Sequence, residues 1–185
     1  MVAGRRPDGE IEMPLAERTL RLAARILMAV AALFAVLMAL HVTADILSKL
    51  LLLDPIDGTS EVVANYYMVG IIFLPLAALQ WSGGHIEAAL FTAGLSPRAQ
   101  QGLTLFSQLL MALVLGLLAW RSGLQAITST GNAEFVPTAS FFLYVWPARW
   151  LLPIGFGVAA LAALAQGVAS LAAPASAAGA AGGKA

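Results

Sequence analysis

The chain has 185 residues, of which 60% are hydrophobic and 11% are charged, whereas a soluble domain carries about 25% charged residues. This length suggests a single domain. A small soluble domain has too much surface to be covered by so few charged residues. Lipid must therefore surround most of the chain. The net charge is zero, which gives no basic field for nucleic acid, and the absence of cysteine excludes disulfides, thiol catalysis and cysteine-ligated clusters.

A mixed segment with five arginines precedes the first apolar run. A secretory signal peptide would have a shorter charged head and a cleavage site of small residues. Here the apolar run continues as a predicted helix past any such site. We therefore expect a cytoplasmic segment over residues 1–21, followed by a retained signal anchor that forms the first span. The five arginines are Arg5, Arg6, Arg18, Arg21 and Arg25.

Four segments are apolar over the length of roughly 20 residues that a membrane span requires. The fold class is therefore predicted as all-α integral membrane, with four transmembrane helices in a domain over residues 22–171 and a disordered tail over 172–185. Pro75 is expected to kink the second span, and the fourth is expected to begin with an aromatic interfacial or re-entrant segment. The predicted spans are residues 26–47, 62–81, 102–120 and 150–171.

The connections are short, which favours antiparallel neighbouring helices. After the second span, Gly83 and Gly84 permit a sharp turn, and His85 then heads a predicted short interfacial helix that includes Ile86. The third helix is expected to begin with Ser96 as its N-cap and Pro97 in its first turn.

The distribution of Lys and Arg predicts the orientation in the membrane. Seven basic residues fall in the N-terminal segment, the second connection and the tail, whereas three fall on the opposite side. Both termini are therefore expected on the cytoplasmic side. The opposite side also carries four acidic residues, namely Asp54, Asp57, Glu61 and Glu134.

Two histidines and a few charges near the span ends are the candidates for chemistry. His41 and His85 are expected on opposite sides of the membrane, so they cannot ligate one haem iron, and packing or interfacial roles are favoured for both. Asp45 and Lys49 are four residues apart, so they share a helix face and can pair. A structural pair that anchors the helix end, or a contact with a partner, is favoured over a proton relay. Arg149 can pair with Glu134, with Glu61 or with a partner's acid, and the sequence leaves these alternatives open.

Small residues repeat every four positions in the first and fourth spans, which lets helices approach closely, although chance repeats are common in an alanine-rich chain. Gln108, in the middle of the third span, is expected to hydrogen-bond to another helix. The sequence shows no nucleophile–base set, phosphate loop or metal motif, so it indicates neither an enzyme nor a cofactor. The two small-residue sets are Ala31, Ala35 and Ala39 (with Thr43), and Gly155, Ala159, Ala163 and Gly167.

The order of motifs "DILSKLLLLDPIDGTSEV", an apolar span and "GGHIEAAL" resembles the small membrane subunit of TRAP (tripartite ATP-independent periplasmic) transporters, the DctQ-like family. The chain departs from that family in having Lys49 where Arg is usual, and Ala88 and Ala89 where an Asp often follows the histidine. The positions that match the family are Asp45, Lys49, Pro55, Gly58, Thr59, Glu61, Gly83, Gly84, His85 and Ile86.

The resemblance implies a scaffold subunit in the bacterial inner membrane. It would bind a large multi-spanning subunit that carries a solute, often a carboxylate, together with sodium ions, and would help to dock a periplasmic solute-binding protein. Possible partner contacts are Asp54, Asp57, Glu134 and Arg149. Two alternatives remain at this stage: a membrane anchor of a respiratory complex, and a small self-contained transporter that works as a homo-oligomer.

Overall fold

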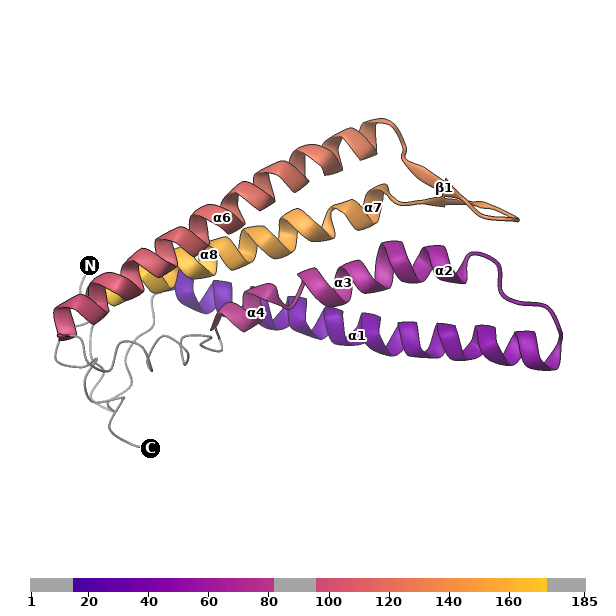
Figure 1. The fold of residues 1–185 in the computed structure, drawn as a ribbon, viewed down its shortest axis with the longest axis horizontal. Helices are drawn as coiled ribbons and strands as arrows, with labels where there is room; N and C mark the ends of the chain where they lie inside the picture. Colours follow the sequence, from indigo (N-terminus) through magenta and orange to yellow (C-terminus); the bar gives the residue numbers. More distant parts are fainter. Residues whose placement is uncertain (1–14, 82–95, 173–185) are drawn as a thin grey trace.

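The computed structural model describes residues 15–81 and 96–172, which form a helical bundle with one β-hairpin (Figure 1). Four helical segments in these ranges are long and apolar enough to cross a membrane, which confirms the predicted number of spans. The elements are α1 (Leu15–Leu51), α2 (Thr59–Val62), the π-helical turn η1 (Val63–Tyr67), α3 (Met68–Phe73), α4 (Leu76–Trp81), α6 (Pro97–Gly131), β1 (Phe135–Pro137), β2 (Phe142–Tyr144), α7 (Trp146–Arg149) and α8 (Leu151–Ala172).

Helices α1 and α6 extend past both ends of the spans predicted for them, reaching 37 and 35 residues. At 1.5 Å per residue each is more than about 50 Å long, against a hydrocarbon core of about 30 Å. The polar residues near their ends do not stop them, because these side chains bond within the helix. Glu17 pairs with Arg21 four residues on, and the hydroxyl of Thr128 donates to the carbonyl of Leu124.

The second span is interrupted twice. Pro75 has no N–H to continue the helix, so α3 ends at Phe73 and α4 begins at Leu76, which Figure 1 shows as a step in the ribbon. The expected interruption at Pro75 is therefore present. Closer to the start of the span, η1 forms a π-helical turn, and the side-chain amide of Asn65 donates to the carbonyl of Glu61 at 2.8 Å.

The third connection differs from the simple link that the sequence suggested. It forms an antiparallel hairpin in which Phe135 pairs with Tyr144, and Pro137 with Phe142. A short helix, α7, begins at Trp146 in the aromatic segment, and α8 follows from Leu151, close to the predicted start of the fourth span at residue 150. Pro147 and Pro153 are tolerated because each lies in the first turn of its helix, where the missing N–H has no helical acceptor.

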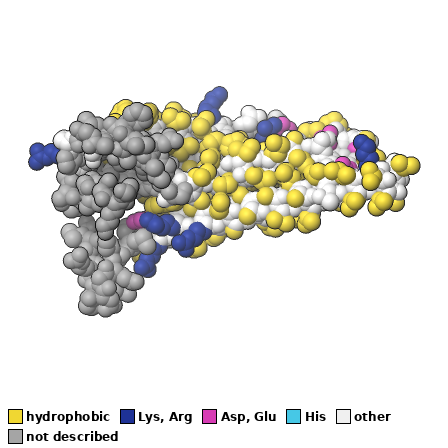
Figure 2. Space-filling view, turned by 60° about the horizontal axis from the view of Figure 1, so that its bottom comes forward, with side chains coloured by type: hydrophobic (Ala, Val, Ile, Leu, Met, Phe, Trp, Pro, Cys, Tyr) yellow, Lys and Arg dark blue, Asp and Glu magenta, His cyan; other side chains and the backbone are white. Residues whose placement is uncertain are grey.

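The spans form two helical hairpins, α1 with α2–α4 and α6 with α7–α8, of which α6 and α8 have the most extensive contact (Figure 1). The core between them is built from small residues, with Ala24, Ala77 and Ala159 at its centre. Large side chains instead cover the outside, and Figure 2 shows them along the length between the two ends. Such an exterior fits lipid as the solvent.

The two ends of the bundle differ in charge. We call the end where α1 begins and α8 ends the terminal end, and the end with β1 and β2 the hairpin end. Figure 2 shows Lys and Arg at both ends, with more of them near the terminal end, whereas Asp and Glu lie mostly toward the hairpin end. The described N- and C-terminal helix ends lie on the same side, as an even number of spans requires.

Candidate functional site

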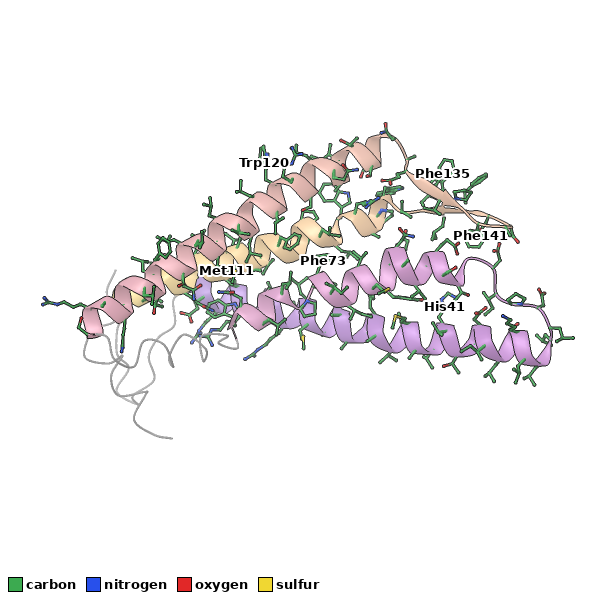
Figure 3. The ribbon with its side chains drawn as sticks, viewed as in Figure 1. His41, Phe73, Met111, Trp120, Phe135 and Phe141 are labelled. Carbon is green, nitrogen blue, oxygen red and sulfur yellow. The ribbon has the colours of Figure 1, made fainter. Side chains whose placement is uncertain are left out.

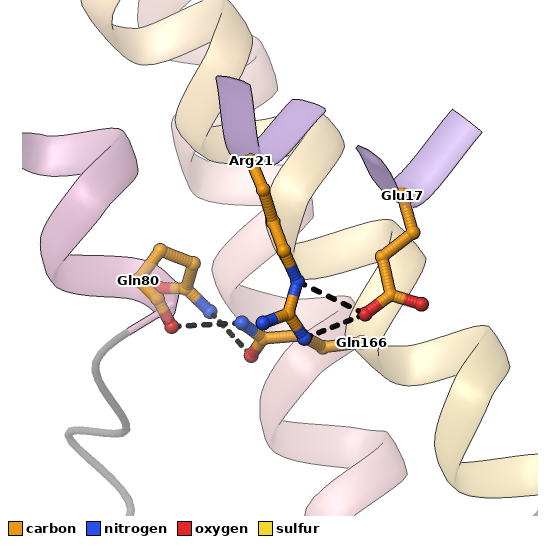
Figure 4. Close-up of polar contacts among 4 residues, drawn as sticks. All are labelled: Glu17, Arg21, Gln80 and Gln166. Atoms are coloured by element: carbon orange, nitrogen blue, oxygen red, sulfur yellow. Dashed lines mark hydrogen bonds and ion pairs between the residues drawn. The ribbon is translucent and has the colours of Figure 1, made fainter. Parts of the chain in front are cut away.

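Three glutamines from three different helices form a cluster at the terminal end. Gln80 of α4 donates to the Oε1 atom of Gln108 of α6 at 2.9 Å, and Gln108 donates to Oε1 of Gln166 of α8 at 3.0 Å. Gln166 in turn donates to the backbone carbonyl of Gln80 at 2.8 Å (Figure 4). The prediction that Gln108 bonds to another helix is confirmed, and this side chain is only 2% exposed.

An ion pair lies beside the glutamine cluster. Arg21 donates to the Oε1 atom of Glu17 from Nε at 3.1 Å and from Nη2 at 2.6 Å (Figure 4). The guanidinium carbon of Arg21 lies 4.7 Å from the ring centroid of Trp81, which places a cation over an aromatic face. Together with Gln108 and Gln166 these residues line a pocket of about 390 Å³.

Sequence reasoning singled out Gln108 and missed Gln80 and Gln166, because each is a single amide near the end of an apolar run. The sequence does contain a feature that could have indicated this cluster. Three spans each carry a glutamine, and a polar side chain in a membrane segment is costly unless it finds a partner. Such isolated amides are therefore candidates for one shared network.

The hairpin end is held together by Asp57, which the sequence suggested as a partner contact. Its carboxylate accepts hydrogen bonds from the backbone N–H groups of Ala139 and Ser140, in the turn between β1 and β2. Partial desolvation raises the pKa of Asp57, but the hydrogen bonds from Ser140 and its neighbours outweigh this and hold the pKa below its ordinary value. Asp57 therefore caps the hairpin turn from the first loop.

The rest of the first loop is fixed by motif residues. Asp45 accepts a hydrogen bond from the backbone N–H of Ile56 at 2.7 Å, and the expected ion pair between Asp45 and Lys49 is not among those of the described residues. The carboxylate of Asp45 thus binds the backbone of the first loop, and pairing of Asp45 with Lys49 stays a prediction. Gly58 has a φ of 78°, and a Cβ there would lie 2.7 Å from the ring of Phe141. Glycine is required at this position because the φ angle is positive and because a side chain would collide with Phe141.

His41 links the first span to the second. Its Nδ1 atom lies 3.3 Å from the hydroxyl of Tyr67, and its Nε2 atom lies 3.5 Å from the hydroxyl of Thr59. Figure 3 shows His41 on the side of α1 that faces α2 and α3. With a hydroxyl near each ring nitrogen, this side chain connects the first span to the start of the second.

Of the alternatives for Arg149, the structure selects Glu134. The Nη2 atom of Arg149 donates to Oε1 of Glu134 at 2.8 Å, and this guanidinium holds the pKa of Glu134 below its usual value. Glu61 instead accepts from the hydroxyl of Ser60 at 3.0 Å, in the first turn of α2. Asp54 is exposed, and only its backbone carbonyl is engaged, by the hydroxyl of Ser48 at 2.6 Å.

The small-residue set of the fourth span faces the interior of the bundle. Gly155, Ala159, Ala163 and Gly167 are all buried. A Cβ at Gly155 would lie 2.2 Å from the backbone oxygen of Phe73, and one at Gly167 would lie 3.4 Å from Cβ of Gln108. At these two glycines the backbone of α8 thus lies close to the second span and to the third span.

The small residues of the first span differ in burial. Ala31 is buried, whereas Ala35 and Ala39 are exposed within this single chain. The face of α1 that turns inward instead carries Ala24, Leu27, Ala31, Phe34 and His41, a repeat of three and four residues. Packing by Ala35 and Ala39 therefore stays a prediction that concerns contact with another molecule.

The motif residues Gly83, Gly84, His85 and Ile86, and with them the predicted interfacial helix, lie outside the described residues. Pro55 lies in the first loop and is exposed. Within residues 15–81 and 96–172, no group of three or more His, Cys, Asp or Glu side chains is placed to hold a metal ion. The polar contacts among the described residues therefore connect helices and loops of this chain to one another.

Comparison with known proteins gave one result. A family model with the description "Tripartite ATP-independent periplasmic transporters, DctQ component" matches residues 38–173, which is most of the chain and includes all of α6, α7 and α8. No curated protein and no solved structure gave a significant match.

Proposed function

The chain belongs to the DctQ component family of tripartite ATP-independent periplasmic transporters, and from this premise we propose that it scaffolds a large multi-spanning transport subunit instead of carrying solute itself. The observation that carries the proposal is the distribution of polar and apolar groups. The described polar side chains within the spans mostly bond to one another or to their own helix backbone. They leave no continuous polar route along the described bundle.

The outer faces of α1 and α6 support the same role. Large apolar side chains are exposed along α1 at Leu33, Val36 and Leu40, and along α6 at Leu113 and Leu117. Ala35 and Ala39 lie on the exposed side of α1 and would allow a partner helix to approach closely. A broad, inert face of this kind suits a static frame beside a moving subunit.

The hairpin end is the proposed docking surface for a periplasmic solute-binding protein. Asp57, Glu134 and Arg149 are engaged in internal contacts, so they shape this surface, and Asp54 offers an exposed charge beside it. Charges at the rim of an interface act mainly on association rate and its salt dependence. We expect Asp54→Lys to change the salt dependence of uptake more than Asp54→Asn does.

The remaining parts of the proposal follow from the family and the charge distribution. The complex would lie in the bacterial inner membrane with both termini of this chain cytoplasmic, since Arg18, Arg21, Arg25 and Arg98 lie at the terminal end. It would import a carboxylate-type solute driven by sodium ions. Neither a respiratory anchor nor a self-contained transporter is favoured by any contact described above.

Reconstitution in liposomes tests the proposal. The full-length chain, the large subunit and the binding protein together should take up solute when a sodium gradient is imposed, and omission of this chain should abolish uptake. Uptake by this chain alone would contradict the scaffold role. Full uptake by the other two components without it would contradict the need for a scaffold.

A further inference from the structure

A second pocket lies beside the glutamine cluster, where α1 meets α4. Its volume is about 240 Å³, and it is lined by Arg21, Ala24 and Arg25 of α1 and by Ala78 and Trp81 of α4. Arg21 and Trp81 also contribute to the larger pocket, but none of the three glutamines lines this one. The two pockets therefore share Arg21 and Trp81 but differ in the rest of their lining.

The two arginines of this pocket differ in how their charge is compensated. Arg21 is paired with Glu17 and stacked on Trp81, so it is both neutralised and held in place. Arg25 follows four residues later on α1 and is exposed, and among the residues described no acid pairs with it. The pocket thus presents one uncompensated positive charge on a rigid helix.

Trp81 adds a donor that lacks an acceptor. Its Nε1 atom is buried and has no hydrogen-bond partner in the described part of the chain. An indole N–H can only donate, and buried donors in folded proteins are nearly always paired. Trp81 and Arg25 line the same pocket, and among the described residues the donor of the first and the charge of the second are unpaired. Both groups favour a ligand that carries negatively charged oxygens.

We propose that this pocket binds the headgroup of an anionic phospholipid, whose phosphate oxygen accepts the hydrogen bond of Trp81 while Arg25 supplies the opposite charge. Trp81 ends the second span, and Trp residues prefer the headgroup level of a bilayer. Met28, one turn deeper than Arg25 on the same side of α1, is exposed and offers apolar surface to an acyl chain. Basic pockets between spans bind anionic headgroups in this way.

Native mass spectrometry of the full-length chain in detergent tests the proposal, with phosphatidylglycerol and phosphatidylcholine supplied in equal amounts. Phosphatidylglycerol adducts should dominate for the unaltered chain. Arg25→Gln should lower the ratio of the two adducts about fivefold, the effect of one cation near an anionic headgroup. Trp81→Phe should also lower it, because this change keeps an aromatic ring near Arg21 but removes the indole N–H.

The matched control is Arg98→Gln, which removes an exposed arginine from α6 at the same end of the bundle, outside the pocket. Its adduct ratio should equal that of the unaltered chain, and circular dichroism should show that all three variants are folded. An unchanged ratio in Arg25→Gln and Trp81→Phe, or an equal loss in Arg98→Gln, would overturn the proposal. So would displacement of the lipid by millimolar inorganic phosphate, which would identify a site for a free anion. The assay needs no transport partner, so it succeeds or fails independently of the proposed function.

Discussion

The two ends of this bundle are stabilised in different ways. At the terminal end, side chains from three spans bond to one another, and the alanine-rich core brings all four spans together. At the hairpin end, the two helical hairpins are joined through loops, where Asp57 caps the β1–β2 turn and the hydroxyl of Tyr66 donates to the carbonyl of Tyr144. The contacts at the terminal end therefore join the helices directly, whereas those at the hairpin end set the shape of an exposed surface.

The largest effect is expected where the two helical hairpins touch, between these regions. Gly155→Ala places a Cβ 2.2 Å from the backbone oxygen of Phe73, and backbone cannot move aside as a flexible side chain does. We expect a loss of about 3 kcal/mol or more in the free energy of unfolding, measured by denaturation in mixed micelles.

Gly157→Ala is the matched control for that variant, because a Cβ at this position, two residues along the same helix, meets nothing within 4 Å. It should leave the stability almost unchanged. Equal losses in the two variants would show that glycine matters here only for the helix backbone and not for contact with Phe73.

A smaller effect is expected within the terminal end. Gln108→Leu removes the centre of the glutamine cluster and leaves the amides of Gln80 and Gln166 with fewer partners in an apolar setting. We expect a loss of about 1–2 kcal/mol in the free energy of unfolding, typical for hydrogen bonds between membrane helices. Gln125→Leu, an exposed position on the same helix, should cost little by the same measurement.

The smallest effect is expected at the hairpin end. Asp57→Asn should leave the global melting temperature nearly unchanged but speed amide exchange at Ala139 and Ser140 several-fold, since an amide is a weaker acceptor than a carboxylate. Asp54→Asn, which removes a nearby carboxylate without a described hydrogen bond, should not do so. A global loss of stability in Asp57→Asn would contradict the separation of the two ends.

The same contact predicts a pH dependence. The pKa of Asp57 in the folded chain lies below its ordinary value of 3.8, so its stabilising bonds are present at higher pH. They are lost only as the pH falls through the lowered pKa. Protection of Ala139 and Ser140 should therefore persist at neutral pH and decline in strong acid, and a decline already at neutral pH would contradict this assignment.

Properties that depend on local sequence were predictable. The four apolar runs gave the spans, Pro75 gave the interruption of the second, and Ser96 caps α6 by accepting from the N–H of Ala99. The buried face of α8 followed from its repeat of small residues. Each of these features involves residues within a few positions of one another, so a periodic pattern or a single residue type is enough to reveal it.

Features that depend on distant segments were not predictable. Asp57 and Ala139 are 82 positions apart, and only the folded chain shows that the first loop reaches the hairpin turn. The strands are three residues each, too short for an alternating pattern to stand out. The spacing of Asp45 and Lys49 suggested a local pair, but a backbone N–H eleven residues away from Asp45 is the partner that the folded loop provides.

The π-helical turn η1 has a consequence for how the second span tolerates changes in length. A π-turn accommodates one more residue than an α-turn, so the helix before it and the helix after it are rotated relative to an uninterrupted α-helix. Two consecutive residues of this turn contact different neighbours, Tyr66 the hairpin and Tyr67 His41. The additional residue also makes η1 the place where the span can absorb a change in length: the loss of one residue there would leave an ordinary α-turn, and Gly70, Leu74 and Ala77 would keep their orientation toward the bundle.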